Sequence, residues 1–224
     1  RIRARAGGLR IGALVTHSRL EEDPRVRRRF PLLVSACSVV GGLAIQNRGT
    51  LVGNVANASP AGDTFPPLAV YEAVVHAVSP ADRRSIRILD VFAGVKKTTL
   101  RPGELIEAVE IPFLKRPPAR QLFRKVGTRA AQALSKVVAA GLLWRRRDGR
   151  IEELRFALGS VAPTVRRLPR VEALVAGERP TLALADEAAR LAAEEIAPID
   201  DVRSTADYRR FVSQALLRDF LVGG

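Results

Sequence analysis

The chain has 224 residues, 47% of them hydrophobic, and a formal net charge of +14. This length and composition suffice for one large or two modest globular domains. Its longest apolar run, residues 137–144, falls far short of the roughly 20 residues that cross a bilayer, so we expect no membrane span. No apolar segment follows the N-terminal arginines, and we therefore expect a cytoplasmic protein.

The single cysteine and the basic charge exclude further classes of protein. Cys37 stands alone, which excludes a disulfide framework and a cysteine cluster for zinc or iron–sulfur groups. Of the 37 basic residues only five are lysine, and the arginines are spread along the chain. No helix-turn-helix, zinc-finger or RNA-recognition motif accompanies them. We predict non-specific adhesion to nucleic acid at low salt, but no specific nucleic-acid function.

Periodicity and chain breakers predict the elements of the first half of the chain. Alternation predicts a strand at 9–16, and Ser18 is a candidate cap for the short helix that follows. A longer helix is expected over 25–40, with a kink or restart at Pro31. A glycine-rich loop is expected over 49–63. A short helix is expected next, over 66–71. A hairpin of strands 74–78 and 85–89 should follow, and then an inner strand over 104–111.

A charged, proline-bounded linker at 115–118 precedes a different pattern. Three strands are expected there, at 120–126, 137–146 and 152–157. Asp148 and Gly149 form a strong hairpin signal between the last two strands. Three helices are expected after them, at 165–175, 182–196 and 204–221. Strands followed by helices indicate an α+β layer, in which helices cover one face of a sheet.

The stretch from Gly49 to Asp63 is the most informative part of the sequence. It holds three glycines, two asparagines and a closing carboxylate, with almost no bulky side chain. Glycine lets main-chain N–H groups approach a phosphate where a Cβ would collide. Thr50, Asn54 and Asn57 can add donors, and Asp63 can accept from ribityl or ribose hydroxyls. By composition alone, a long Asn/Gly turn explains the stretch equally well.

Hydrolytic and metal chemistry receive little support. His17 and His76 are the only histidines, and each lies in or beside an apolar run without a partner constellation, so structural roles are favoured. Asp200 and Asp201 could pair or bind a metal. Capping of the final helix or pairing with Arg203 is favoured instead.

The residues around the glycine-rich stretch carry a family resemblance. From Asn47 to Asp63 the sequence resembles the second flavin-contacting segment of the FAD (medium) subunits of the xanthine dehydrogenase and carbon monoxide dehydrogenase family of molybdenum hydroxylases. Further similar segments occur in the family's order over nearly the whole chain: 9–17, 96–106, 111–112, 123–129 and 157–164.

The resemblance implies a fold and a function. Residues 1–114 would be the remainder of a two-part FAD-binding domain of the vanillyl-alcohol-oxidase (PCMH) type. Residues 119–224 would be a C-terminal flavoprotein domain, a three- to four-stranded antiparallel sheet with helices on one face. The chain would be an oxidoreductase subunit that passes electrons through FAD to NAD or another acceptor. Its partners would be an iron–sulfur subunit and a molybdopterin subunit, in a hetero-oligomer.

The resemblance also implies cofactor contacts, which fall on Gly49, Thr50, Leu51, Val52, Gly53, Asn54, Asn57 and Asp63. Leu105 or Ile106 lies where an apolar residue packs on the flavin or adenine, and core packing explains this pair equally well. Lys125 lies where a side chain approaches the flavin ring, and its charge would stabilise reduced, anionic flavin. Without the family, a surface lysine is favoured at this position.

Two departures from the family pattern lead to a second hypothesis. The family's earlier Gly-Gly-Thr-Asp-type loop has no counterpart before Leu9, so we interpret the chain as a fragment, or a processed or mis-started product. Val52 stands where the family has glycine, and a β-branched side chain would occupy space near the cofactor. The alternative is therefore a shortened subunit that keeps its fold and interfaces, binds FAD weakly or not at all, and acts as an assembly scaffold.

Overall fold

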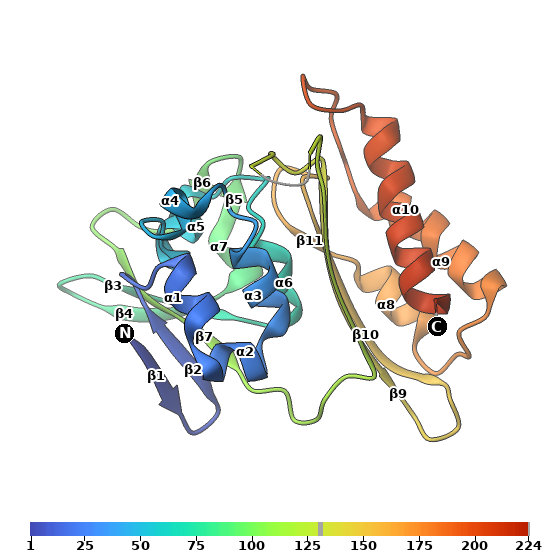
Figure 1. The fold of residues 1–224 in the computed structure, drawn as a ribbon, viewed down its shortest axis with the longest axis horizontal. Coiled ribbons are helices and arrows are strands. Elements are labelled where there is room, and N and C mark those ends of the chain that lie inside the picture. Colours follow the sequence, from blue (N-terminus) through green and yellow to red (C-terminus); the bar gives the residue numbers. More distant parts are fainter. Residues whose placement is uncertain (130–131, 224) are drawn as a thin grey trace.

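The computed structural model describes residues 1–129 and 132–223, which form two parts side by side (Figure 1). A five-stranded antiparallel sheet organises the N-terminal part, and a four-stranded antiparallel sheet organises the C-terminal part. A small separate sheet pairs β5 (Phe92–Gly94) with β6 (Lys97–Thr98). Sheets and helices in this arrangement confirm the expected α+β class.

The N-terminal sheet has the strand order β1-β2-β7-β3-β4. Its strands are β1 (Ile2–Arg5), β2 (Gly8–Gly12), β3 (Val74–Val78), β4 (Arg83–Arg87) and β7 (Leu105–Pro112). One face packs in the core through residues such as Ile11, Val75 and Val109. The helices beside that face are α1 (His17–Glu22), α2 (Pro24–Arg29), α3 (Pro31–Cys37), α4 (Leu43–Gln46), α5 (Leu51–Asn57), α6 (Phe65–Val70) and α7 (Ile88–Val91). The opposite sheet face carries polar side chains.

Two local signals set the first helices. The cap of α1 is Thr16, whose hydroxyl accepts from the Arg19 N–H, and the prediction of Ser18 was wrong by two positions. The expected helix over 25–40 is divided at Phe30, whose φ of −135° is not helical. Pro31 then begins α3, because a proline fits the first helical position, where its missing N–H has no partner to lose.

The C-terminal sheet has the order β11-β10-β9-β8, from β8 (Arg120–Val126), β9 (Val137–Arg145), β10 (Ile151–Gly159) and β11 (Arg166–Arg167). Strand β9 is buried on both faces. Its Ala140, Leu142 and Trp144 join the core shared with the N-terminal part, whereas Ala139 and Leu143 face the helices. Those helices are α8 (Pro169–Val175), α9 (Leu182–Glu195) and α10 (Ala206–Val222). The sheet therefore lies between its own helices and the N-terminal part (Figure 1).

The helix expected over 165–175 is shorter than predicted. Arg166 and Arg167 pair with β10 as a short strand, and α8 begins only at Pro169. Arg167 leaves that strand to bind the carboxylate of Glu172 through two hydrogen bonds of 2.5 and 2.7 Å. Strand pairing and this ion pair together override the helical periodicity of the segment.

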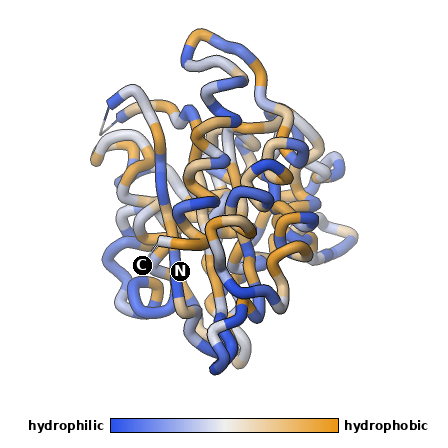
Figure 2. The backbone as a smooth tube through the Cα atoms, turned by 90° about the vertical axis from the view of Figure 1, so that its right-hand side faces the viewer, coloured by the Kyte–Doolittle hydropathy of each residue, from blue (hydrophilic) through white to orange (hydrophobic). Residues whose placement is uncertain are grey.

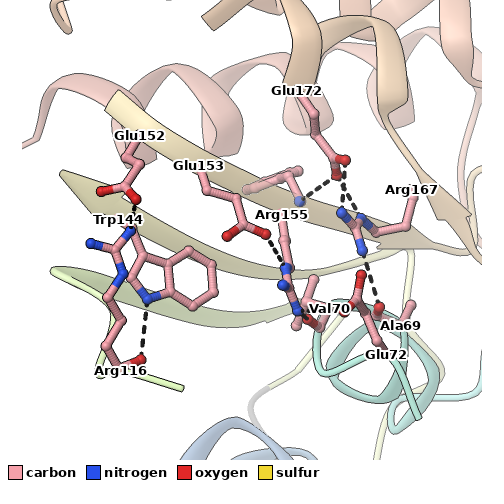
Figure 3. Close-up of polar contacts among 11 residues, drawn as sticks. Ala69, Val70, Glu72, Arg116, Trp144, Glu152, Glu153, Arg155, Arg167 and Glu172 are labelled. Carbon is pink, nitrogen blue, oxygen red and sulfur yellow. Dashed lines mark hydrogen bonds and ion pairs between the residues drawn. The ribbon is translucent and has the colours of Figure 1, made fainter. Parts of the chain in front are cut away.

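Arginines of the C-terminal part also cap a helix of the N-terminal part (Figure 3). The last carbonyl groups of α6 accept hydrogen bonds of 3.3 Å from Arg155, at Val70, and from Arg167, at Ala69. Arg155 lies 2.9 Å from Glu72, just beyond α6. Cations at a helix C-terminus complement its dipole and satisfy its free carbonyls. These contacts help to fix how the two parts meet.

The connection between α9 and α10 projects beyond both helices and alternates apolar with polar residues (Figures 1 and 2). Ile199 and Val202 are exposed there. Over residues 1–129 and 132–223, no helix is both long enough and apolar enough to cross a membrane.

Candidate functional site

The glycine-rich stretch is not one long loop, as predicted, but contains helix α5. Thr50 caps the helix, because its hydroxyl accepts from the Gly53 N–H at 2.9 Å. Leu51, Val52 and Val55 are buried in the core. The apolar residues of this stretch therefore serve packing, which its few bulky side chains did not indicate.

Four of the predicted cofactor contacts share the other face of α5, whereas Leu51 and Val52 are buried. Thr50, Gly53, Asn54 and Asn57 follow the i, i+3, i+4, i+7 spacing of one helical face, and all four are at least partly exposed. Val52 lies on the buried side and packs in the core. Its β-branched side chain is therefore accommodated within the helix, and the objection raised by its replacement of glycine no longer holds.

Gly49 and Gly53, at the start of α5, have no Cβ and so allow neighbouring groups to approach closely. A Cβ on Gly49 would lie 3.0 Å from the Ile45 carbonyl oxygen and 3.4 Å from the His17 ring. A Cβ on Gly53 would lie 2.9 Å from the capping hydroxyl of Thr50. The His17 N–H donates to the Gly49 carbonyl at 3.0 Å, which ties the start of α1 to the start of α5.

Both asparagines of this face are oriented by a partner. The Oδ1 of Asn54 accepts from the Thr64 hydroxyl at 2.6 Å, and the Oδ1 of Asn57 accepts from Lys96 Nζ at 2.8 Å. Each amide thereby turns its acceptor toward the protein and leaves its Nδ2 donors for a ligand. Phosphate and hydroxyl oxygens accept from such donors, so the exposed face of α5 fits an FAD pyrophosphate or ribityl group.

Asp63 and Lys125, both predicted as flavin contacts, bind each other. Lys125 Nζ on β8 lies 2.7 Å from Asp63 Oδ2 and also donates to the Val39 carbonyl at 2.9 Å. The Ser135 hydroxyl donates to the other carboxylate oxygen. Burial raises the pKa of Asp63, against the opposing effect of Lys125 and Ser135. The prediction of a surface lysine, made without the family, is thus wrong.

The apolar pair on β7 is separated by the alternation of the strand. Leu105 is 72% exposed, whereas Ile106 is 7% exposed and packs in the core. Helix α5 packs beside β7. The core interpretation applies to Ile106, whereas Leu105, like Glu107, lies on the sheet face that points away from the helices.

A cavity of about 360 Å³ lies between the two parts. Its lining is mostly apolar, from Pro60, Ala61, Val95, Leu134, Ala162, Pro163, Ala197 and Ile199, with the polar residues Ser59, Lys96, Ser135, Ser160, Asp201, Arg203 and Arg209. Ser135 belongs both to this lining and to the Asp63 cluster. The cavity therefore adjoins the predicted flavin contacts.

Unusual backbone conformations gather at this cavity. Ala58, Lys96 and Ser160 all have positive φ, of 47°, 57° and 65°, which costs energy for residues other than glycine. The Lys96 N–H donates to the Ala58 carbonyl, and the Ser160 N–H to the Pro60 carbonyl, at 3.0 and 2.9 Å. Such strain concentrates at functional sites.

The polar wall of the cavity is built around Arg209. Its guanidinium donates to the Ser160 and Lys136 carbonyls, at 2.6 and 3.0 Å, and to Asp201 at 2.8 Å. Burial acts to raise the pKa of Asp201. Hydrogen bonds from the Arg203 and Ser204 N–H groups, together with the charge of Arg209, outweigh burial and lower this pKa. Within the described chain, Ser160 Oγ is buried without a hydrogen-bond partner, and a ligand group or water could satisfy it.

Sequence reasoning missed Lys96, Ser135, Ser160 and Arg209 as site residues. Lys96 and Ser160 lie in segments that resemble the family, but nothing local indicates their positive φ. Asp201, considered as a possible metal ligand, instead pairs with Arg209 and Arg203. In residues 1–129 and 132–223 no three His, Cys, Asp or Glu side chains gather as metal ligands.

Comparison with known proteins identifies the family. Residues 1–114 match the FAD binding domain in molybdopterin dehydrogenase, and residues 122–222 match the CO dehydrogenase flavoprotein C-terminal domain. The glyceraldehyde dehydrogenase medium chain of Sulfolobus acidocaldarius is 30% identical over 96% of this chain and 75% of its own length. The carbon monoxide dehydrogenase medium chain of Hydrogenophaga pseudoflava is 27% identical over 97% of this chain and 75% of its own.

Solved structures agree with the sequence matches. Quinoline 2-oxidoreductase from Pseudomonas putida 86 superposes with a TM-score of 0.89 at 31% identity, over 99% of this chain and 76% of that chain. Carbon monoxide dehydrogenase from Hydrogenophaga pseudoflava superposes with a TM-score of 0.92 at 26% identity, with the same coverage. The chain therefore belongs to the FAD-binding medium subunits of the xanthine dehydrogenase and carbon monoxide dehydrogenase family of molybdenum hydroxylases, which are oxidoreductases.

Proposed function

We propose that this chain holds FAD on the exposed face of α5 and passes electrons from an iron–sulfur partner subunit to an acceptor. A molybdopterin subunit would supply those electrons by oxidising the substrate. The observation that carries the proposal is the single helical face that Thr50, Gly53, Asn54 and Asn57 share, on which the two asparagines keep their Nδ2 donors for a ligand. The redox chemistry is that of the flavin, which takes up and releases electrons.

The protein's own residues would bind and orient the cofactor. Asn54 and Asn57 would donate through Nδ2 to phosphate or ribityl oxygens, because their Oδ1 atoms are already engaged. Lys125 and Lys96 place positive charge at the junction of the two parts. Such charge lowers the energy of a negative group held near it in a poorly hydrated site.

The cavity between the two parts would receive the electron acceptor, NAD or another molecule. It adjoins the Asp63 cluster through Ser135, and Lys96 connects its rim to Asn57 on α5. Its apolar lining suits a planar ring, and Lys96 and Arg203 suit an anionic group on the same molecule. The acceptor and the flavin would then meet at the junction of the two parts.

FAD titration of the purified chain, followed by quenching of flavin fluorescence, tests this proposal. Saturable binding is expected, and Asn57→Ala should weaken it about tenfold through the loss of about 1.4 kcal/mol of hydrogen bonding. Gln121→Ala, on the exposed side of β8, is the matched amide control and should bind as the parent chain does. Equal affinities for all three chains would refute the assignment to α5.

A scaffold without flavin is the second candidate, and one observation favours it. The Asp63 carboxylate already has two protein partners, Lys125 and Ser135, so the two parts meet without any ligand. Such a chain could bind its partner subunits while lacking FAD. No binding at high micromolar FAD, by a chain with a cooperative unfolding transition, would select this candidate over the first.

A further inference from the structure

His76, interpreted from the sequence as a lone structural histidine, lies between two polar partners. Its Nδ1 is 3.1 Å from the Ser85 hydroxyl, and its Nε2 is 3.1 Å from a carboxylate oxygen of Glu110. His76 and Ser85 are directly opposite on β3 and β4, and Glu110 comes from the adjacent β7. All three lie on the sheet face opposite the helices.

The carboxylate decides which ring nitrogen carries the proton. Ionised Glu110 can only accept, so the neutral His76 ring donates through Nε2. Nδ1 is then left with its lone pair directed at the Ser85 hydroxyl. This order of nucleophile, base and orienting carboxylate is the arrangement that activates serine for acyl transfer.

A shallow cavity of about 180 Å³ opens beside Ser85 and is lined by Arg10, Arg83, His76 and Glu107, among others. The guanidinium groups of Arg10 and Arg83 both contact Glu107, at 2.8 and 3.1 Å. Each guanidinium has five N–H donors, so both retain donors for a ligand. The cavity can therefore bind an anionic substrate and stabilise an oxyanion that develops next to Ser85.

We propose that Ser85, His76 and Glu110 form a second site, separate from the flavin site, which hydrolyses small esters that carry a carboxylate. The Ser85 oxygen attacks the ester carbonyl while its proton moves to His76 Nδ1. The tetrahedral oxyanion collapses, the C–O bond to the alcohol breaks, and the alcohol leaves with the proton from Nδ1. Water then attacks the acyl-serine by the same proton route, which releases the acid and restores Ser85.

The test uses the full chain with the 4-nitrophenyl monoester of succinic acid. We expect release of 4-nitrophenolate, a succinyl group on Ser85 by peptide mass mapping, and a lower kcat/KM for neutral 4-nitrophenyl acetate. Ser85→Ala should reduce kcat/KM by about 100-fold or more, as expected for loss of an activated nucleophile. Ser38→Ala is the control, because Ser38 is exposed and its hydroxyl donates to the Ser35 carbonyl of its own helix end.

A second variant tests the activation of the serine without turnover. Ser85→Cys should react with iodoacetate faster than Ser38→Cys, and the advantage should disappear when His76→Gln is added. Unchanged hydrolysis in Ser85→Ala would overturn the proposal. So would hydrolysis that depends on His76 but not on Ser85, because the imidazole alone would then be the nucleophile. Equal alkylation rates of the two cysteine variants would overturn it as well.

Discussion

Lys125 and Asp63 form a buried ion pair that joins the two parts of the molecule, with Nζ and Oδ2 2.7 Å apart. The lysine comes from β8 of the C-terminal part, and the aspartate follows α5 of the N-terminal part. Lys125 also donates to the Val39 carbonyl, so one side chain holds two segments of the N-terminal part. The pair places one positive and one negative charge beside the predicted flavin face and beside the cavity between the two parts.

Breaking this pair should destabilise the chain. Lys125→Met leaves the buried Asp63 carboxylate without its cation, and removal of one partner from a buried pair costs about 3–5 kcal/mol. We expect a loss in that range in the free energy of unfolding, measured by urea denaturation. Lys115→Met, on the exposed linker, is the control and should change stability by no more than about 0.5 kcal/mol.

Addition of Asp63→Asn to Lys125→Met should restore part of the loss, because the unpaired charge is then removed. A double variant as unstable as the sum of the two single variants would show that the residues act independently. The ion pair would then have no role in holding the two parts together.

Loss of the α5 cap should weaken both the helix and the flavin face. Thr50→Ala removes the hydroxyl that accepts from the Gly53 N–H, and loss of such a cap costs about 1 kcal/mol. Thr50→Ser keeps the hydroxyl and should retain both stability and FAD affinity. Urea denaturation and FAD titration measure the two effects, and an Ala variant indistinguishable from Ser would contradict the role of Thr50.

Filling the cavity between the two parts should block binding of the electron acceptor and leave FAD binding unchanged. Ile199 lines the cavity and is 68% exposed, so Ile199→Trp can extend into the cavity without disturbing the core. We expect a higher KM for the acceptor in the assembled enzyme, with unchanged FAD content. Leu182→Trp, at a 59% exposed position on α9, is the control. If both variants reduce the acceptor equally well, the acceptor binds elsewhere.

Acid should destabilise the chain through His17. The ring is 2% exposed, and burial lowers its pKa from 6.5 to about 4. Between these values the unfolded chain binds a proton that the folded chain does not, so stability falls as the pH falls. The difference of about 2.5 pH units corresponds to about 3 kcal/mol, lost between pH 6.5 and 4.

Comparison with His17→Leu isolates this effect from the other titrating groups. As the pH falls from 7.5 to 4.5, the parent chain should lose more unfolding free energy than His17→Leu does. Any stability advantage of the parent chain at pH 7.5 should therefore shrink, or pass to the leucine variant. Denaturation curves at these two pH values measure it. A gap that does not change with pH would contradict the burial of a neutral His17.

Helix α5 shows why part of the fold escaped prediction. Gly53, Asn54 and Asn57 are poor helix formers, so the sequence reads as a loop. Burial of Leu51, Val52 and Val55 supplies the stabilisation that local propensity lacks. The opposite error occurs at 165–167, where helical periodicity yields to pairing with β10. In both places a tertiary contact decides the element.

The sequence by itself determined the fold class and the family, and it led to the residues proposed for the flavin face, because these depend on local order and on motifs within short segments. It did not determine which distant side chains meet. Asp63 and Lys125 are 62 residues apart, and His76 meets Glu110 across 34 residues. The first pair forms only when β8 packs against the segment after α5, and the second only when β3 and β7 pair in the observed register. The cavity between the two parts likewise exists only where two separate surfaces of the folded chain meet.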